Sequence, residues 1–254
     1  MTSTDYIDLL KHYSKNLTEY KSQYTIFNPT LKNDGILKSK IKRCILSENL
    51  ETKECQTVEN ELKKLNDNII KCNKCPLNLK RNNAAIGRGA LKPLIMFIGK
   101  SPKTEEDNAG LAFQDKIKEV IDNILIKVLQ IPVETAYFTN ALKCIPNNIG
   151  VSEFHKCLNV CSEYLYSEID ILQPKIICPL GNEALHILFK DQIHEKNTIT
   201  ELHGKSLNYK SIITVPTLNP GAFISHPDPN NEKRRIVFED MKKLRQIMID
   251  LNFI

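Results

Sequence analysis

Several features that would place a chain outside the class of soluble globular proteins are missing from this sequence. It has no tryptophan, no internal repeat and no long low-complexity tract. No apolar run approaches the roughly 18 residues that cross a bilayer as a helix, so we expect no membrane association. The first residues lack a basic stretch followed by an apolar one, which argues against a secretory signal peptide. We therefore expect a cytoplasmic protein.

A strong excess of charge of one sign is also missing. The chain has 35 basic and 30 acidic residues, which gives a formal net charge of +5. Its isoelectric point of about 8.6 falls short of the value above roughly 9 that indicates a nucleic-acid-binding domain. With 41% apolar and 26% charged residues the composition is that of an ordinary globular protein. Charge alone favours plain solubility over a polyanionic partner.

The second half of the chain alternates short apolar runs with helical patterns. The runs cover residues 94–98, 135–138, 175–178 and 211–215, and the helical patterns lie near residues 117–128, 153–172, 183–189 and 233–251. Alternation of this kind is typical of a parallel sheet with helices on both faces. We expect a three-layer α/β/α fold around a central, mainly parallel four-stranded sheet.

The chain divides into two predicted parts. Residues 1–57 are expected to form an N-terminal extension that is partly helical, and residues 58–254 to form the α/β domain. The basic run at residues 38–43 is better interpreted as a solvated linker than as a DNA-binding arm. Apolar residues at helical spacing predict a helix that leads directly into Cys72; they are Val58, Leu62, Leu65 and Ile69.

Eight cysteines in an intracellular chain predict thiols and metal ligands rather than disulfides. Cys72 and Cys75 form a Cys-x-x-Cys pair that can bind one metal centre from a single turn. Cys144 and Cys161, far along the chain, would complete the site only after folding. By itself the pair favours structural zinc, and Cys157, one helical turn before Cys161, is a competing ligand.

In parallel α/β sheets, ligands bind at the carboxyl ends of the strands, so the loops that begin at residues 99, 139, 180 and 216 are candidate site loops. Backbone N–H groups from Gly99 to Ser101 are suited to hold a carbonyl oxygen. Phe113 could stack on a planar base, although a core phenylalanine is the simpler interpretation. Asn140 offers a paired donor and acceptor for a base edge, and it could equally be a turn residue.

These loops resemble the family 4 uracil-DNA glycosylases, the iron–sulfur branch of that superfamily. The first motif matches in register at Gly99, Pro102, Glu106, Asp107, Gly110 and Phe113. Further matches are Thr139-Asn140, Lys143-Cys144, Cys161 with Tyr164 and Leu165, Leu180-Gly181, His203-Gly204, and the stretch 72–89 with Arg81, Gly87 and Gly89. The resemblance covers about residues 58–250.

Three positions depart from the family pattern. Lys100 stands where the family has a glutamate, and Lys103 stands where it has a glycine. Asn219-Pro220 replaces the family's His-Pro, whose histidine stabilises the anionic leaving group. Asparagine is found at this point in the mismatch-specific branch of the superfamily. Lys100 and Asn219 are therefore the candidate catalytic residues.

The resemblance implies an enzyme of base-excision repair that flips uracil out of DNA and hydrolyses its N-glycosidic bond. It implies a [4Fe–4S] cluster, with zinc as the alternative, held by Cys72, Cys75, Cys144 and Cys161. Candidate substrate-binding residues are Gly99, Ser101, Phe113 and Asn140. The partner is uracil-containing DNA, single- or double-stranded, and a monomer is expected. The alternative is an iron–sulfur DNA-binding or accessory protein that keeps the fold with weakened or lost catalysis.

A basic cluster follows the last motif. Lys233, Arg234 and Arg235 are expected to open the C-terminal helix. Amide groups at a helix N-terminus together with basic side chains suit phosphate contacts. The alternative is an ordinary solvated first turn.

Overall fold

The structure is a computed structural model that describes residues 55–190, 198–224 and 231–254. The expected N-terminal extension therefore lies outside the described residues, apart from its last three positions. Those three, residues 55–57, begin a helix that runs to residue 70. The basic run at 38–43 also lies outside.

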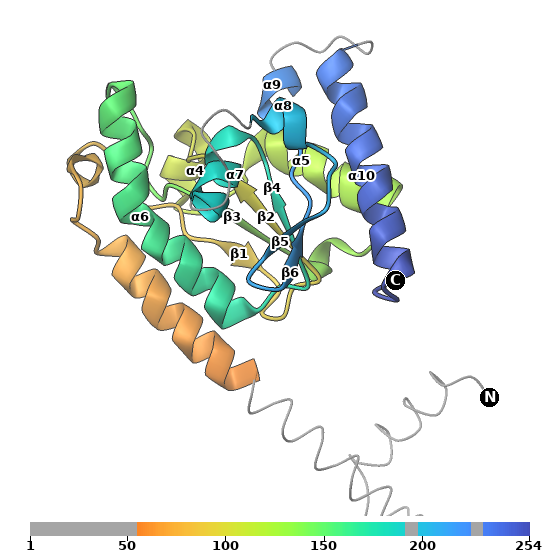
Figure 1. Ribbon diagram of the computed structural model, residues 1–254. Helices are drawn as coiled ribbons and strands as arrows, with labels where there is room; N and C mark the ends of the chain where they lie inside the picture. The colour runs from red at the N-terminus through yellow and green to blue at the C-terminus, as the bar shows by residue number, and fades with distance from the viewer. Residues whose placement is uncertain (1–54, 191–197, 225–230) are drawn as a thin grey trace, which may run out of the picture. The chain divides into compact units, whose positions relative to one another are not determined.

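In the described part of the chain, six strands form one mixed sheet in the order β1-β3-β2-β4-β6-β5 (Figure 1). The four central strands are parallel: β3 (Ala136–Asn140), β2 (Ile95–Gly99), β4 (Ile176–Pro179) and β6 (Ile212–Thr214). Two short antiparallel strands close the edges: β1 (Arg88–Gly89) and β5 (Leu207–Tyr209). The predicted parallel core is confirmed, and the predicted strand count of four is wrong. The edge strands have two and three residues, too few to show the alternation that predicts a strand.

Alternate residues of β2 feed two separate cores, because successive side chains of a strand point to opposite faces. Met96 and Ile98 belong to the core under the helix at 55–70, α6 (Val151–Leu172) and α7 (Asn182–Phe189). Ile95 and Phe97 belong to the core under α5 (Asp115–Asn123) and α10 (Glu232–Asp250). Figure 1 shows α6 and the helix at 55–70 on one side of the strands and α10 on the other. The three-layer α/β/α fold is confirmed.

The helix predicted near 117–128 differs from expectation. It is α-helical only to Asn123 and continues as a π-helical segment, η3 (Ile124–Leu129), which ends at Gln130 in the left-handed region. Four apolar side chains of this π-helical segment lie in the core, where the segment packs against α10; they are Ile124, Leu125, Val128 and Leu129.

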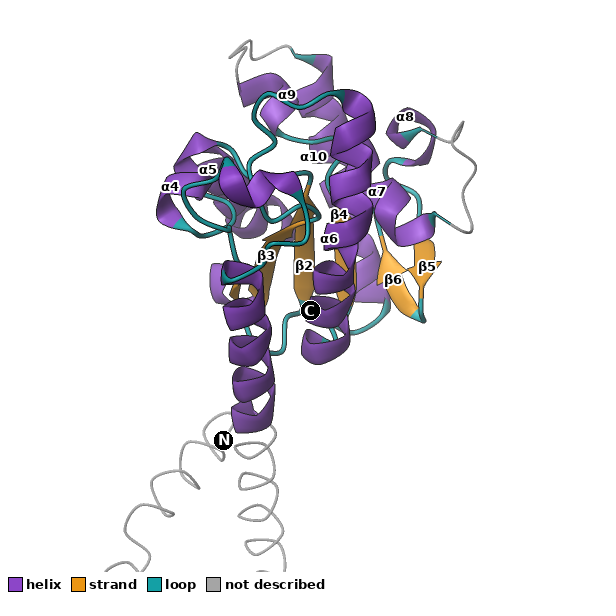
Figure 2. Cartoon of the chain, turned by 90° about the vertical axis from the view of Figure 1, so that its left-hand side faces the viewer, coloured by secondary structure: helices purple, strands orange, loops and turns teal. Residues whose placement is uncertain are grey.

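The remaining elements are short. They are the 3₁₀ turns η2 (Pro76–Leu79) and η4 (Val133–Thr135), and the helices α4 (Thr104–Ala109), α8 (Ile199–Leu202) and α9 (Gly221–Ile224). Helices α4 and α9 follow β2 and β6, and Figure 2 shows both beyond the same end of the sheet. That end is where the carboxyl ends of the parallel strands gather and where the predicted site loops begin. No described helix is long and apolar enough to span a bilayer.

Candidate functional site

Gly99, Phe113 and Asn140, three predicted substrate-binding residues, meet at the carboxyl ends of β2 and β3. Gly99 and Asn140 are register partners in the parallel pair of strands. A Cβ atom placed on Gly99 would lie 2.2 Å from Asn140 Oδ1 and 3.3 Å from Phe113 Cε2. Any side chain at position 99 would therefore displace both neighbours. The glycine allows the amide and the aromatic ring to approach the backbone of the first loop.

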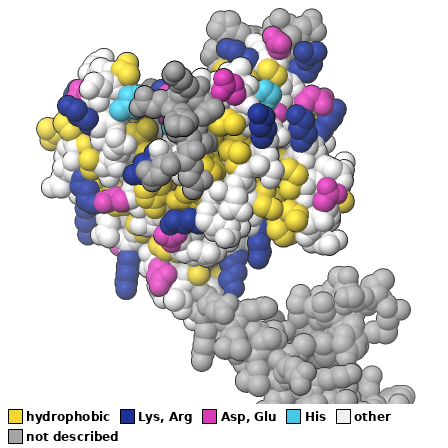
Figure 3. Space-filling model, viewed as in Figure 1, with side chains coloured by type: hydrophobic (Ala, Val, Ile, Leu, Met, Phe, Trp, Pro, Cys, Tyr) yellow, Lys and Arg dark blue, Asp and Glu magenta, His cyan; other side chains and the backbone are white. Residues whose placement is uncertain are grey.

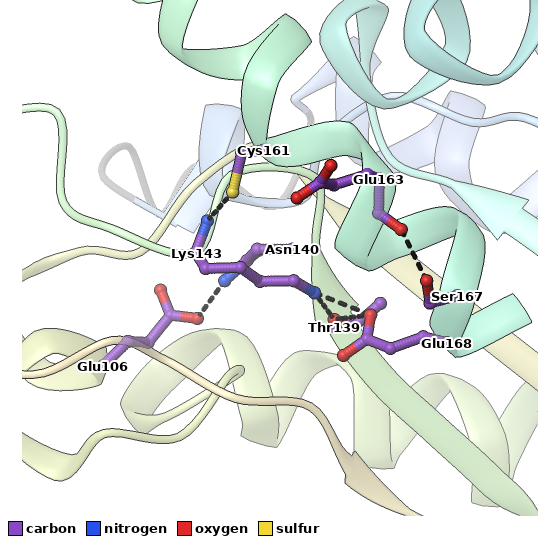
Figure 4. A network of polar contacts seen from close by, with 8 residues as sticks. All are labelled: Glu106, Thr139, Asn140, Lys143, Cys161, Glu163, Ser167 and Glu168. Atoms are coloured by element: carbon purple, nitrogen blue, oxygen red, sulfur yellow. Dashed lines mark hydrogen bonds and ion pairs between the residues drawn. The ribbon is translucent and has the colours of Figure 1, made fainter. Parts of the chain in front are cut away.

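A buried carboxylate, Glu106 of α4, organises these residues. Its Oε1 accepts hydrogen bonds from Asn140 Nδ2 at 2.8 Å and from the Phe113 backbone N–H at 2.7 Å. Its Oε2 accepts from the Lys103 backbone N–H at 2.9 Å. Figure 4 shows the Glu106 carboxylate facing the Asn140 amide. A carboxylate accepts hydrogen bonds and does not donate them, so the Asn140 amide must turn its nitrogen and not its oxygen toward Glu106. Glu106 thereby sets the orientation of the Asn140 amide.

Phe113 lies in the core as well as in the loop. Its side chain is 1% exposed and its ring packs against Phe138 with centroids 5.5 Å apart. The backbone at Phe113 has φ 55°, a left-handed conformation that is uncommon for a bulky residue and is often found at functional sites. Arg88 donates to the carbonyl oxygens of Ala112 and Phe113 and so supports this turn. Stacking of Phe113 on a base stays a prediction.

The loop after Gly99 presents free backbone donors. No acceptor among the described residues takes a hydrogen bond from the N–H of Lys100 or of Ser101. The Lys100 side chain lies elsewhere: its Nζ is 2.6 Å from Glu183 Oε1 on α7 and 4.7 Å from the centroid of the Phe154 ring. At position 100 the structure therefore has an ion pair rather than an isolated cation.

Asn219 lies in the loop after β6, beside the loop after β4. Its Oδ1 accepts a hydrogen bond from the Gly221 N–H at 2.8 Å, which leaves its amide nitrogen as the end that can donate. A Cβ on Gly181 would lie 3.5 Å from Asn219 Cβ. Thr217 anchors the loop from the other side, since its hydroxyl donates to buried Asp240 of α10 at 2.6 Å. His226, a few residues beyond Asn219, lies outside the described residues.

The four predicted cysteine ligands line one cavity between the helix at 55–70, α6 and the loop after β3; they are Cys72, Cys75, Cys144 and Cys161. None of the described cysteines forms a disulfide. Cys144 and Cys161 are buried, and Cys72 and Cys75 are half-buried. Cys157 lies beside the Cys75 thiol but is not among the residues that line the cavity.

Hydrogen-bond donors point at these sulfurs. Arg81 Nη1 lies 2.9 Å from Cys144 Sγ, and the Lys143 backbone N–H lies 3.4 Å from Cys161 Sγ. Burial raises the pKa of the Cys161 thiol to about 12. Burial also raises the pKa of the Cys144 thiol, and this effect outweighs the lowering by the hydrogen bond from Arg81. A bound metal would ionise both thiols. Four cysteines around one cavity, with a guanidinium and an amide aimed at their sulfurs, fit a metal centre with four thiolate ligands.

The sulfurs are not gathered around a single point. Within the described ranges, no three His, Cys, Asp or Glu side chains are arranged to hold one metal ion.

The segment 139–144 joins the cysteine cavity to the base pocket. Lys143, 1% exposed, donates from Nζ to Thr139 Oγ1 and to Glu168 Oε2 of α6, both at 2.6 Å. Thr139 Oγ1 donates to the same carboxylate at 2.8 Å. Figure 4 shows Asn140 between this network and Glu106. Glu106 thus holds Asn140, and the buried Lys143–Glu168 pair holds its chain neighbour Thr139.

The predicted basic cluster opens α10 as expected. Asn231 caps the helix by accepting from the Lys233 N–H at 3.0 Å. Lys233, Arg234 and Arg235 are all exposed, and Figure 3 shows basic side chains on the face of the molecule that α10 forms. Arg235 lies 3.9 Å from Glu232, and Arg234 lies over the Phe223 ring at 5.5 Å. Their contact with phosphates stays a prediction.

Sequence reasoning missed several residues of the site. Glu106 and Arg81 match the family motifs, but nothing in their local sequence predicts a role for either residue. Glu183 and Glu168 carry no local signal, because their partners Lys100 and Lys143 are 83 and 25 residues away along the chain.

Comparison with known proteins places the chain in a family. A family model described as the uracil DNA glycosylase superfamily matches residues 86–242. A "Type-4 uracil-DNA glycosylase" of Sulfurisphaera tokodaii is 34% identical over 74% of this chain and 85% of its own length. Proteins of the same name from Saccharolobus solfataricus and Thermotoga maritima are 31% and 30% identical, over 72% and 76% of this chain and 84% and 97% of their own lengths. The chain therefore belongs to the uracil DNA glycosylase superfamily.

Proposed function

We propose that this protein is a uracil-DNA glycosylase that hydrolyses the N-glycosidic bond of uracil in DNA during base-excision repair. The observation that carries the proposal is the meeting of Gly99, Phe113 and Asn140 around buried Glu106, in a member of this superfamily. A base within a duplex must first be flipped out of the stack to reach such a pocket. Flipping costs less from single-stranded DNA, so both kinds of substrate are expected.

The pocket residues have separate roles in recognition of the base and in cleavage of the bond. Asn140, oriented by Glu106, reads the Watson–Crick edge of the flipped uracil. The free N–H groups of Lys100 and Ser101 hold a carbonyl oxygen of the base. As the bond between C1′ and N1 breaks, its electron pair stays on uracil and the sugar approaches an oxocarbenium ion. Water then adds to C1′, and the products are an abasic sugar and free uracil.

Asn219 contributes a hydrogen bond to the departing base. With its oxygen held by Gly221, the amide nitrogen is free to donate. An amide has no charge, so it stabilises the developing anion less than a cationic donor would.

The cysteine cavity supports a [4Fe–4S] cluster held by Cys72, Cys75, Cys144 and Cys161. The cluster would supply a rigid crosslink between the helix at 55–70, the segment 139–144 and α6. Because Cys144 lies four residues beyond Asn140, a cluster there would hold the segment that carries Asn140. This structural role is sufficient to explain the cluster. The chemistry at uracil is carried by the side chains and amides of the pocket.

The glycosylase unit is proposed to be residues 58–254, a monomer that acts on DNA inside the cell. The three relatives cover 72–76% of this chain, a share close to that of residues 58–254, and 84–97% of their own lengths.

The test is incubation of the purified protein with single- and double-stranded oligonucleotides that contain one uracil, followed by alkali to cleave abasic sites. We expect cleavage at the uracil position in both. Asn140→Ala should abolish it, and Asn159→Ala, an exposed position on α6, should not. If the wild type binds DNA and leaves every uracil intact, the proposed activity is wrong and the accessory-protein alternative is favoured.

A further inference from the structure

Lys103 occupies a position between the two halves of the pocket. Its backbone N–H donates to Glu106, the carboxylate that also holds Asn140 and Phe113. Its side chain extends toward the loop after β6, 118 residues along the chain: a Cβ placed on Gly221 would lie 3.4 Å from Lys103 Nζ. The same point lies 3.1 Å from Asn219 Oδ1. The ammonium group and the Asn219 amide oxygen therefore both lie beside Gly221, in the loop that carries Asn219.

This ammonium group is not engaged elsewhere in the part of the chain that the structure describes. No hydrogen bond or ion pair of its Nζ occurs with a described residue, in contrast to Lys100, which is paired with Glu183. The residue is exposed, and its backbone is fixed because it caps α4. A charge on a side chain with a fixed base and a free end is available to a ligand.

The proposed reaction requires stabilisation of negative charge near Asn219. Bond cleavage leaves a full negative charge on uracil, and the neutral amide of Asn219 is the donor at the position where the family carries histidine. Replacing one strong donor to a developing oxyanion typically costs on the order of 100-fold in rate. A cation at the same place would offset that loss through a charge-assisted hydrogen bond.

We propose that Lys103 is a catalytic residue whose ammonium group stabilises the negative charge developing on the departing uracil, beside Asn219. The inference rests on the proposed function. The bond between C1′ and N1 breaks with its electron pair on the base, and the ammonium group donates a hydrogen bond to the resulting anion. Water supplies the hydroxyl that bonds to C1′, and its second proton ends on the released uracil. The two substitutions relative to the family, Lys103 and Asn219, thus compensate one another.

The experiment measures single-turnover excision at saturating protein, with uracil and with 5-fluorouracil in the same oligonucleotide. Lys103→Met keeps an unbranched side chain that is one heavy atom shorter and removes the charge. We expect it to slow excision of uracil by about 10- to 100-fold. The fold-change should be smaller for 5-fluorouracil, because fluorine already stabilises the anion. Lys103→Arg should keep most of the rate, and Lys175→Met, an exposed position at the amino end of β4, should keep all of it.

A second arm uses the neighbouring position. In the Lys103→Met background, Asn219→His should recover much of the lost rate, since it returns the family's donor to the spot that the ammonium group has left. The gain from Asn219→His should be smaller in the wild type, where Lys103 already acts.

Three results would overturn the inference. They are an unchanged rate for Lys103→Met, an equal slowing on both bases, and a loss confined to the dissociation constant for DNA and its salt dependence, as for a phosphate contact. Each of these requires an active wild type. An inactive wild type would instead overturn the proposed function, and the inference with it.

Discussion

At the scale of single residues, Glu106 is the group on which the pocket depends. It is 5% exposed and accepts three hydrogen bonds, from the side chain of Asn140 and from the backbone of Phe113 and Lys103. A buried donor that loses its acceptor costs about 1–3 kcal/mol. Changes here are therefore felt both in the fold of the loop and in the orientation of Asn140.

We expect Glu106→Gln to lower the rate of uracil excision by more than 10-fold with a modest loss of stability. Glutamine has one acceptor oxygen. If this oxygen faces Asn140 and Phe113, the NH2 group faces the Lys103 N–H, and if it faces Lys103, Asn140 loses its acceptor, so either orientation disturbs the loop that positions Asn140. Single-turnover excision and thermal melting separate the two effects. Glu105→Gln, the exposed neighbour on α4, is the control. A fully active Glu106→Gln protein would show that Asn140 needs no support from this carboxylate.

Lys100 belongs to an ion pair, and this changes what a substitution there does. Lys100→Glu would return the family residue but place it against Glu183, 2.6 Å from the present ammonium nitrogen. We expect the single variant to excise uracil more slowly because the two carboxylates repel. The double exchange Lys100→Glu with Glu183→Lys should restore the pair and recover the rate.

The pair is partly exposed, so its effect on stability should stay within about 1 kcal/mol. Excision rates for the two single variants and the double variant form a cycle that measures the coupling. Additive effects would mean that Lys100 and Glu183 act independently.

At the scale of elements, the segment 139–144 connects two sites. It begins at the end of β3 with Thr139 and Asn140 and ends at Cys144 in the cysteine cavity. The buried Lys143–Glu168 pair holds its middle to α6. A disturbance at the cysteines should therefore reach Asn140.

The protein as purified should be brown, with broad absorbance near ~400 nm from thiolate-to-iron charge transfer. Cys72→Ala and Cys161→Ala should remove the colour and slow excision, since the segment 139–144 loses its anchor. Cys55→Ala, in the first turn of the helix at 55–70, should change neither. Stoichiometric zinc in a colourless anaerobic preparation would disprove the cluster.

The basic side chains in the first turn of α10 lead to a separate prediction about DNA affinity. Substituting Lys233, Arg234 and Arg235 by Ala should weaken binding at low salt and flatten its salt dependence, because each phosphate contact contributes about 0.7–0.9 to the slope of log K against log salt. The preference for uracil should not change. Fluorescence anisotropy across a salt series measures both, and an unaltered slope would assign these residues to an ordinary solvated turn.

At the scale of the whole molecule, the proposed cluster joins three elements that are distant in sequence. Removing it by oxidation and chelation should lower the melting temperature by on the order of 10 °C, because metal binding to folded ligands adds directly to the free energy of unfolding. Differential scanning calorimetry of the holo- and apo-protein checks this. The Cys157→Ala protein should melt like the wild type when loaded. An equal melting temperature with and without the cluster would contradict its role as a crosslink.

The parallel core and the motifs can be predicted from the amino-acid sequence alone. Each central strand is a short apolar run, each long helix has its own periodicity, and both signals are local to the residues concerned. The spacing of Thr139, Asn140 and Cys144 is likewise contiguous, so the link between base pocket and cysteines could be predicted.

The remaining features follow only from the packed fold, because they depend on pairs of residues that are distant in sequence. Strands β1 and β5 exist through their neighbours, being too short to form alone. The partner of Lys100 is set by how α7 packs above β4, and the reach of Lys103 to Gly221 is set by the closeness of the loops after β2 and β6. The charge of each side chain is known from the sequence, whereas the partner that each charged group contacts depends on how the elements pack.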